Sequence, residues 1–146
     1  MQVQDFVYPA LLSPEAGGAF TVTFPNFPEA ISSGKNRADA LAQAEDCLQE
    51  AVAGRMIRKE KIPLASRLKR GQAAVGVALY LAPKLALYLA MREKRVNNSQ
   101  LARQLGVTEA LVRRMLNPRH DTRPERLQEA LEALGKKVVV AVEDAA

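Results

Sequence analysis

Cysteine and histidine are scarce in this sequence, which has one of each among 146 residues. The lone cysteine, Cys47, excludes a framework of disulfides within the chain and any metal site built from several cysteines. His120 has no second acid–base group in an obvious pairing, so we interpret it as a turn residue or a phosphate contact rather than a catalytic base. We therefore expect no metal and no cofactor, and a reducing, cytoplasmic location.

Long apolar runs are also absent. The longest candidate, "AAVGVALYLAPKLALYLAM", is interrupted by Pro83 and Lys84, whereas a membrane helix needs roughly 18 consecutive apolar residues. The first residues, "MQVQDFVYPALL", lack the basic start of a signal peptide. We expect no membrane partner, and the apolar content of 48% is enough for a folded core.

Negative charge becomes scarce in the second part of the chain. Up to Ile62 there are six Lys or Arg residues against eight Asp or Glu, a net charge of −2, whereas from Pro63 onward there are fifteen against eight, a net charge of +7. We expect the two parts to meet different partners, and the basic part suits a polyanion such as nucleic acid. A solvated basic surface without a specific partner is the alternative.

The first half has the pattern of a small sheet covered by one helix. Strands are predicted at 4–12, at 19–24 from the alternation in "AFTVTF", and at 30–34, with Pro and Gly marking the turns. Residues 36–61 repeat apolar positions at steps of three and four, which predicts a long helix capped by Asn36, with an end or bend at Gly54 as the alternative. A further strand is predicted at 74–81.

A helical half follows. Four helices are predicted from apolar spacing, at 83–94, 99–105, 109–116 and 124–134. "KKVVVAVE", residues 136–143, is predicted to be a strand that pairs either within its own chain or with a second copy. The fold class is therefore α+β. An N-terminal domain at 1–80, with an antiparallel sheet and one packed helix, precedes an all-helical domain at 81–146 that ends in the strand.

The stretch "NNSQLARQLGVTEALVRRMLN" in the second half has the spacing of a helix-turn-helix. Such a motif needs a small residue where the second helix packs on the first, and a turn residue that accepts left-handed backbone dihedrals. Ala102 and Gly106 meet these two needs. The positions expected to be buried hold Leu101, Leu105, Val107, Val112 and Met115. Asn98 or Ser99 is expected to cap the first helix, and Thr108 the second.

The second helix of this stretch is expected to present cations and hydrogen-bonding groups to double-stranded DNA. Arginine bonds guanine and asparagine bonds adenine in the major groove, while helix N-termini, hydroxyl groups and flanking arginines hold phosphates. The residues expected to contact DNA are Ser99, Gln100, Thr108, Glu109, Ala110, Arg113, Arg114, Asn117 and Arg119, with Arg103 and Arg123 as further phosphate contacts. One such domain covers only a half-site, so we expect a homo-oligomer, a dimer or higher. The alternative is an ordinary helical hairpin with an arginine-rich face.

The first domain has carboxylates but no recognisable catalytic set. A metal-dependent nuclease needs several clustered carboxylates to hold Mg²⁺. Those available are scattered: Asp5 is on the first predicted strand, Glu29 is in the proline-marked segment after the second, and Asp39, Glu45 and Asp46 are on the exposed face of the predicted helix. We therefore expect no catalytic residue and no enzyme activity.

The N-terminal half resembles the HicB antitoxin family. The segment "GGAFTVTFPNFPEAISSGKNRADALAQAEDCLQEAV" has that family's Gly–aromatic–Val–Thr–Phe–Pro run, then Pro-Glu-Ala, a polar step to Gly and an alanine-rich helix. The C-terminal half is similar to members that carry a helix-turn-helix, through "LAPKLALYLA", "SQLARQLGV", "RHDTRPERLQEALEALGK" and the terminal valines. The resemblance spans nearly the whole chain. Asn26 and Ser33 depart from the Asp and Thr that are frequent at these positions.

The resemblance implies a role in a type II toxin–antitoxin system. The first domain would be a truncated ribonuclease-H-like fold that covers HicA, a small RNA-cleaving toxin with a double-stranded-RNA-binding-like fold. The second would repress the protein's own operon by binding operator DNA. The residues expected to contact the toxin are Phe20, Phe24, Asn26, Phe27 and Glu29, with Glu15 and Asp39 as further candidates, because carboxylates suit the basic surface of a ribonuclease. The phenylalanines equally suit a core.

Two other functions remain open: a stand-alone DNA-binding transcription regulator whose first domain senses a ligand or another protein, and a nuclease. A neighbouring short reading frame for a small basic protein favours the antitoxin, and its absence favours the regulator. Metal-dependent RNA cleavage by the chain alone would support the nuclease.

Overall fold

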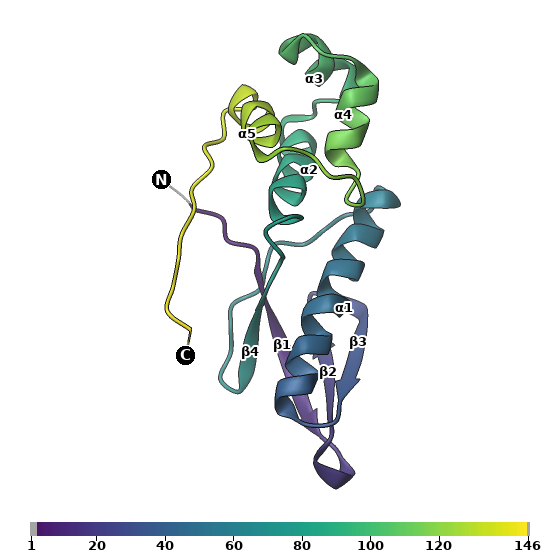
Figure 1. Cartoon of the computed structure of the whole chain (residues 1–146), viewed down its shortest axis with the longest axis vertical. Coiled ribbons are helices and arrows are strands. Elements are labelled where there is room, and N and C mark those ends of the chain that lie inside the picture. The colour runs from purple at the N-terminus through teal and green to yellow at the C-terminus, as the bar shows by residue number, and fades with distance from the viewer. Residues whose placement is uncertain (1–2, 146) are drawn as a thin grey trace. The chain divides into compact units, whose positions relative to one another are not determined.

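The computed structural model describes residues 3–145. These residues form two compact units that divide between Ala82 and Pro83, called unit 1 and unit 2 below (Figure 1). Unit 1 holds a four-stranded antiparallel sheet with one long helix, and unit 2 is built from helices. The predicted α+β class is therefore confirmed. None of the described helices is long and apolar enough to cross a membrane.

Unit 1 has one sheet and one long helix. Its elements are β1 (Val7–Pro14), η1 (Ala16–Gly18), β2 (Phe20–Phe24), β3 (Phe27–Gly34), α1 (Arg37–Ile57) and β4 (Gln72–Gly76). The strands lie in the order β3-β2-β1-β4, and each neighbouring pair is antiparallel. The edges of the sheet are therefore β3 and β4.

Helix α1 covers one face of this sheet (Figure 1). Alternation along the strands turns side chains such as Tyr8 and Val22 inward, where both are fully buried. The helix contributes small residues and Leu48 to this core, and it approaches the end of β3 so closely that a Cβ on Gly34 would lie 2.2 Å from the backbone nitrogen of Ala40. Only glycine fits at this position.

The predicted cap of α1 is confirmed, because Asn36 Oδ1 accepts a hydrogen bond from the Asp39 N–H at 2.9 Å. The helix ends at Ile57, earlier than predicted. The third strand begins earlier than predicted, at Phe27, because a two-residue turn and a β-bulge after Thr23 return the chain directly into it. Pro28 is tolerated there because β3 is an edge strand.

The fourth strand is shorter and earlier than predicted. It spans Gln72–Gly76, and the apolar residues Leu79 and Tyr80 are exposed, at 81% and 65%. The backbone N–H groups of Leu81 and Ala82 both donate to the Ala78 carbonyl, which turns the chain toward the next helix. A short continuous apolar run does not by itself show where a strand ends, so the run at 74–81 predicted a strand where part of the segment is a turn.

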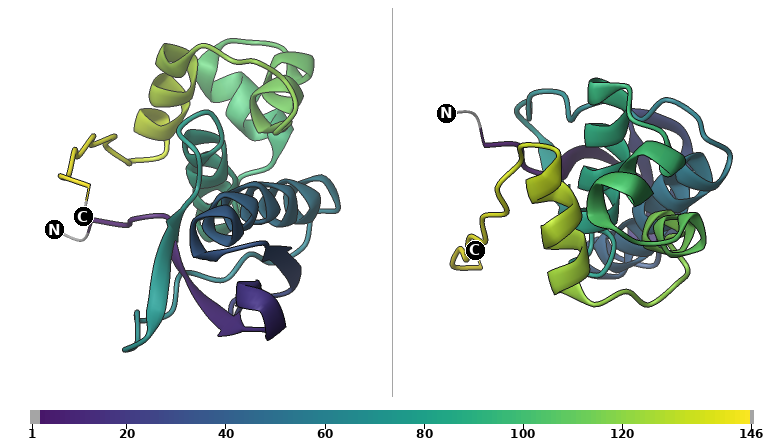
Figure 2. Two further views of the ribbon diagram at one scale, coloured as in Figure 1. Left: turned by 60° about the horizontal axis from the view of Figure 1, so that its bottom comes forward. Right: turned by 90° about the horizontal axis from the view of Figure 1, so that it is seen from above.

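Unit 2 consists of α2 (Ala82–Lys94), α3 (Asn98–Leu105), α4 (Glu109–Leu116) and α5 (Pro124–Ala133) (Figure 2). All four helices contribute to one core. Its buried members are Leu87, Ala90, Met91, Leu101, Ala102, Val112, Met115, Leu127, Ala130, Leu131 and Leu134. The short helices therefore hold their places by packing around a shared centre, because helices of this length are marginal alone.

The strand predicted at 136–143 is wrong for the single chain. The described residues after α5, up to 145, form no strand, and Val139, Val140 and Val142 are exposed at 58%, 76% and 93%. Figures 1 and 2 draw this segment, in yellow, as coil. A strand needs a neighbour to take its backbone hydrogen bonds, and the described elements of unit 2 are all helices, so the unit offers no strand edge.

Candidate nucleic-acid interface and toxin-binding surface

Helix α3 begins at a capping box. The Asn97 side chain accepts from the Gln100 N–H at 2.8 Å, and the Gln100 side chain accepts in return from the Asn97 N–H at 2.9 Å. The cap lies one residue before the two predicted candidates, Asn98 and Ser99, because only Asn97 has a Gln three residues further on. The side chain of Gln100 thus serves the helix start.

The turn after α3 has the geometry of a Schellman motif. Gly106 has φ 69° and ψ 34°, in the left-handed region. Its N–H donates to the Arg103 carbonyl at 3.3 Å, and the Val107 N–H donates to the Ala102 carbonyl at 2.9 Å. A residue with a Cβ rarely adopts these dihedrals, so the turn depends on glycine.

Helix α4 is capped and amphipathic. Thr108 Oγ1 accepts from the Leu111 N–H at 3.2 Å, as predicted for this cap. Val112 and Met115 are buried. The opposite side presents side chains that are exposed or, for Ala110, half-buried: Glu109, Ala110, Arg113, Arg114 and Asn117. The structure therefore gathers five of the predicted DNA contacts on one side of this helix.

A buried lysine holds the C-terminal end of α4. The Nζ atom of Lys84, on α2, donates to the carbonyls of Arg114 and Met115, both at 3.0 Å, and to Thr122 Oγ1 at 2.7 Å. Lys84 is only 2% exposed, and burial lowers the pKa of its ammonium group to about 8, against the opposing effect of the Asp121 carboxylate. A cation at this end of the helix complements the helix dipole.

Several predicted DNA contacts are held by local hydrogen bonds. Asn117 Oδ1 accepts from the Arg119 N–H at 2.9 Å, and Ser99 Oγ accepts from Arg103 Nη1 at 2.8 Å. Asparagine needs both its oxygen and its nitrogen to bond an adenine. The bond from the Arg119 N–H already fixes the orientation of the Asn117 amide. The guanidinium groups of Arg113 and Arg114 are exposed on α4, which makes them the better candidates for base reading.

The structure places two of the predicted toxin contacts in the core of unit 1. Phe24 is 2% exposed and Phe27 is fully buried. The ring of Phe27 packs edge-on against Tyr8, with ring centroids 4.9 Å apart, and the guanidinium of Arg55 lies 4.8 Å from its centroid. Because they are buried, these phenylalanine side chains offer no contact surface in this structure. Spacing alone could not predict this, since apolar residues occur on both faces of the sheet. Phe20 is half-buried.

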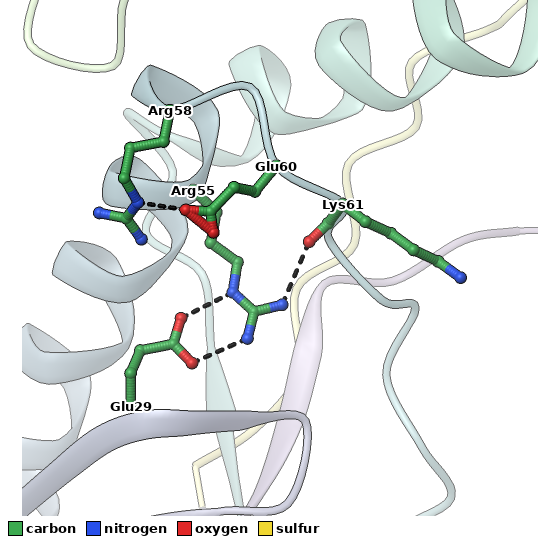
Figure 3. Close-up of polar contacts among 5 residues, drawn as sticks. All are labelled: Glu29, Arg55, Arg58, Glu60 and Lys61. Carbon is green, nitrogen blue, oxygen red and sulfur yellow. Dashed lines mark hydrogen bonds and ion pairs between the residues drawn. The ribbon is translucent and has the colours of Figure 1, made fainter.

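Asn26 and Glu29 are engaged within unit 1. Asn26 Oδ1 accepts from both the N–H and the Oγ of Ser66, at 3.2 and 3.0 Å, which ties the β2–β3 turn to the loop before β4. Glu29 forms a bidentate pair with Arg55, with oxygen–nitrogen distances of 2.6 and 2.7 Å (Figure 3). The hydrogen bonds from Arg55 lower the pKa of Glu29.

The face of the sheet opposite α1 carries exposed apolar residues that sequence analysis did not single out. Leu11, Thr23 and Ile31 stand side by side on three neighbouring strands, and Leu11 and Ile31 are 44% and 63% exposed. Val7 lies further along β1 and is 41% exposed. Alternation in β2 was the available signal, since it implies a second face of the sheet as well as a core face.

The comparison with known proteins now identifies the family. Residues 7–86 match the model of the HicB-like antitoxin of bacterial toxin–antitoxin systems. The chain belongs to the HicB-like antitoxin family. It is 31% identical over 141 residues to Antitoxin HicB 1 of Photorhabdus laumondii, covering 97% of this chain and 90% of that one. It is 33% identical over 131 residues to Antitoxin HicB of Escherichia coli K12, covering 90% of this chain and 95% of that one.

Membership of the HicB-like family bears on the chemistry. Antitoxins are non-enzymatic regulators, so the prediction that this chain is no enzyme is confirmed. Two of the candidate carboxylates are engaged locally: Asp39 accepts from the Lys35 N–H at the start of α1, and Glu29 is paired with Arg55. Among residues 3–145, no group of three or more His, Cys, Asp or Glu residues could hold a metal ion.

The HicB-like unit 1 is less acidic than the sequence suggested. The unit includes the loop with Arg67, Lys69 and Arg70, which brings nine Lys or Arg residues against eight Asp or Glu, a net charge of +1. Unit 2 carries twelve against eight, a net charge of +4. Net charge therefore does not by itself attract unit 1 to a basic toxin, and any electrostatic attraction must come from local carboxylates.

Proposed function

We propose that this HicB-like protein neutralises a HicA-type RNA-cleaving toxin by direct binding, and represses its own operon by binding operator DNA, in the cytoplasm. The family match carries the antitoxin part. The capped pair α3–α4, with Arg113 and Arg114 exposed on the second helix, supports the DNA-binding part. The helix-turn-helix character of this pair and the ribonuclease-H-like origin of unit 1 belong to the same proposal.

Helix α4 is the element proposed to enter the major groove. Its N-terminal end carries the small side chains of Thr108 and Ala110 beside the exposed Glu109, and its exposed side carries the two arginines. Since the recognition helix of such a module covers a half-site, two copies would bind half-sites about 34 Å apart. The protein is therefore proposed to act as a homo-oligomer on DNA.

Replacing Arg113 and Arg114 by alanine tests the DNA-binding part. The double variant is expected to bind operator DNA more weakly, with a salt slope lower by about 0.9 for each phosphate that the removed arginines neutralise in the wild type. The matched control removes the same charge from unit 1, through Arg67→Ala and Arg70→Ala. Equal affinity and slope for the α4 variant and the wild type would show that this helix is not the reading element.

The face of the sheet opposite α1, which carries Leu11, Thr23 and Ile31, is called the open sheet face, and it is the surface proposed to cover the toxin. Leu11 and Ile31 are apolar and exposed on it, as the centre of a protein interface requires. Occlusion of the toxin's RNA-binding surface then blocks cleavage without any chemistry by the antitoxin.

Co-expression with the protein encoded by the neighbouring reading frame tests this surface. Leu11→Lys and Ile31→Lys are expected to reduce capture of the toxin by at least about tenfold, because each buries a charge in the interface. Ile57→Lys is the matched control, since Ile57 is 50% exposed at the end of α1. Capture that survives both sheet variants would place the toxin elsewhere, and lack of a toxin frame would favour a stand-alone regulator.

A further inference from the structure

The segment Lys137–Glu143 is an exposed strand-forming sequence without a strand. It reads KVVVAVE, and the exposure of its valines rises from 38% at Val138 to 93% at Val142. Valine favours strands over coil, and exposed apolar segments of this kind pair readily with other strands. Because the described elements of unit 2 are helices, the partner strand must come from outside this unit.

The ends of the segment carry opposite charges. Lys137 opens it and Glu143 closes it, with Lys136 and Asp144 one position further out. Two copies of such a sequence in antiparallel orientation place a lysine opposite a carboxylate at both ends, whereas a parallel pair places like charges opposite one another. The segment is therefore complementary to itself only in the antiparallel sense.

Symmetry then fixes the register. In a two-fold antiparallel pair the axis passes between two copies of the same residue. With Val140 at the axis, Lys137 faces Glu143 and Val138 faces Val142. With Val139 at the axis Lys137 would face Ala141, and with Ala141 at the axis Glu143 would face Val139, so both shifts set charges against apolar residues.

We propose that Lys137–Glu143 pairs with the same segment of a second copy of this chain, antiparallel, with Val140 opposite Val140. Three valines of each copy, at 138, 140 and 142, then share one face of the ribbon. This gives a surface and a register to the homo-oligomer of the proposed function. The tests below use the free chain without DNA or toxin, so their outcome is independent of either activity.

The start of the segment is already anchored on the helical core. The Lys136 N–H donates to the Leu131 carbonyl at 2.9 Å, and its ammonium group lies 2.8 Å from Glu93. A two-stranded ribbon is marginal by itself, so an anchored start next to the core lets the valine face pack there. Because Lys136 already serves Glu93, Lys137 and Glu143 are the diagnostic charges.

Cysteine cross-linking tests the register. The full chain with Cys47→Ser provides a background without thiols. In that background, Val140→Cys sets two thiols opposite each other, with Cα atoms about 4.5–5.5 Å apart, which lies within the range of a disulfide. Mild oxidation should give a covalent dimer. In the Val142→Cys control, the two copies of residue 142 are about 13 Å apart and should not cross-link. Faster cross-linking at 142 than at 140, or none at 140, overturns the register.

Charge reversal tests the pairing without relying on oxidation. Lys137→Glu alone and Glu143→Lys alone each set like charges opposite at both ends, and each should raise the dissociation constant of the dimer by about tenfold in sedimentation experiments. Mixing the two variants, or combining them in one chain, restores opposite charges and should restore dimerisation. Lys69→Glu and Glu129→Lys are controls for the charge change, and circular dichroism checks folding. Wild-type dimerisation by either single variant, or a monomeric wild-type chain whose valine amides are protected from exchange by its own sheet, overturns the proposal.

Discussion

At the scale of single residues, buried and half-buried polar groups hold the two units in shape. Lys84 binds three acceptors at the end of α4. Arg55 binds Glu29 and the Lys61 carbonyl (Figure 3), and it also lies over the ring of Phe27. Each cation connects parts of its unit that are distant in sequence. Substituting Lys84 or Arg55 therefore removes several interactions at once. In this respect the two differ from the exposed basic residues of their units.

The lowered pKa of Lys84 predicts a pH dependence of stability. Its pKa is about 8 in the folded chain, against an ordinary value of 10.5 for the unfolded chain. Between these values the unfolded state binds more protons, so the contribution of Lys84 to the free energy of unfolding rises with pH over this window and is constant below it. The difference in unfolding free energy between wild type and Lys84→Met should grow accordingly in urea titrations.

Lys94→Met is the matched control for that experiment, because Lys94 is exposed in the last turn of the same helix. Its difference from wild type should stay flat over the same window. A flat difference for Lys84→Met as well would mean that the ammonium group is as well solvated as a surface lysine.

The Glu29–Arg55 pair predicts a modest coupling that acid removes. A double-mutant cycle with Glu29→Gln and Arg55→Gln should give a coupling of about 0.5–1 kcal/mol at neutral pH, since the pair is bidentate but partly exposed. The pKa of Glu29 is lowered below 4.5, so the coupling is complete above that value and is lost as the pH falls through the folded-state pKa. The more exposed pair Arg58–Glu60 should couple less, and an equal value for both pairs would contradict the role of geometry.

At the scale of elements, the turn between α3 and α4 fixes where the second helix points. Gly106 has φ 69°, and a Cβ there would meet no described atom within 4 Å, so the requirement for glycine is conformational and not steric. Gly106→Ala should lower the free energy of unfolding of unit 2 by about 1 kcal/mol and weaken DNA binding. Gly76→Ala, at a position with ordinary dihedrals, should be close to neutral in denaturant titrations. Full stability of the Gly106 variant would show that the turn tolerates a side chain.

Sequence patterns predicted the elements whose signals are local. The spacing of apolar residues indicated α1, α3 and α4, and Gly106 indicated the turn, because each depends on neighbours within a few positions. Lys84 was not foreseen as a contact of α4, since its acceptors lie about 30 residues away and only the packed unit brings them together. The segment at 136–143 has the composition of a strand, but pairing requires an edge that composition does not provide.

The candidate sites show the same division. Thr108 was predicted as a cap and is one, because capping is decided by the adjacent turn. Phe24 and Phe27 were predicted as toxin contacts and lie in the core, because which face of a sheet is covered depends on the path of α1. The open face with Leu11 and Ile31 became visible only when the strands were placed in register.

At the scale of the whole molecule, two compact units predict two separable activities. A cut before Ser66, close to the change of charge at Pro63, would remove β4 and the hydrogen bonds between Asn26 and Ser66, and so would expose the edge of β1. The structure divides after Ala82 instead. Residues 1–82 are therefore expected to fold and to neutralise the toxin, while residues 83–146 retain the elements proposed to bind DNA.

Expressing the two fragments separately tests this division. Residues 1–82 should rescue growth of cells that produce the toxin but give no shift of operator DNA, and residues 83–146 should shift operator DNA without rescuing growth. The fragment 1–65 is the control: it lacks β4 and should unfold at lower denaturant concentration than 1–82, because its sheet loses a strand that packs on the core through Val75. If 1–82 is as folded as the full chain in circular dichroism and still fails to protect cells, neutralisation requires both units, and the toxin must be covered by more than the open sheet face.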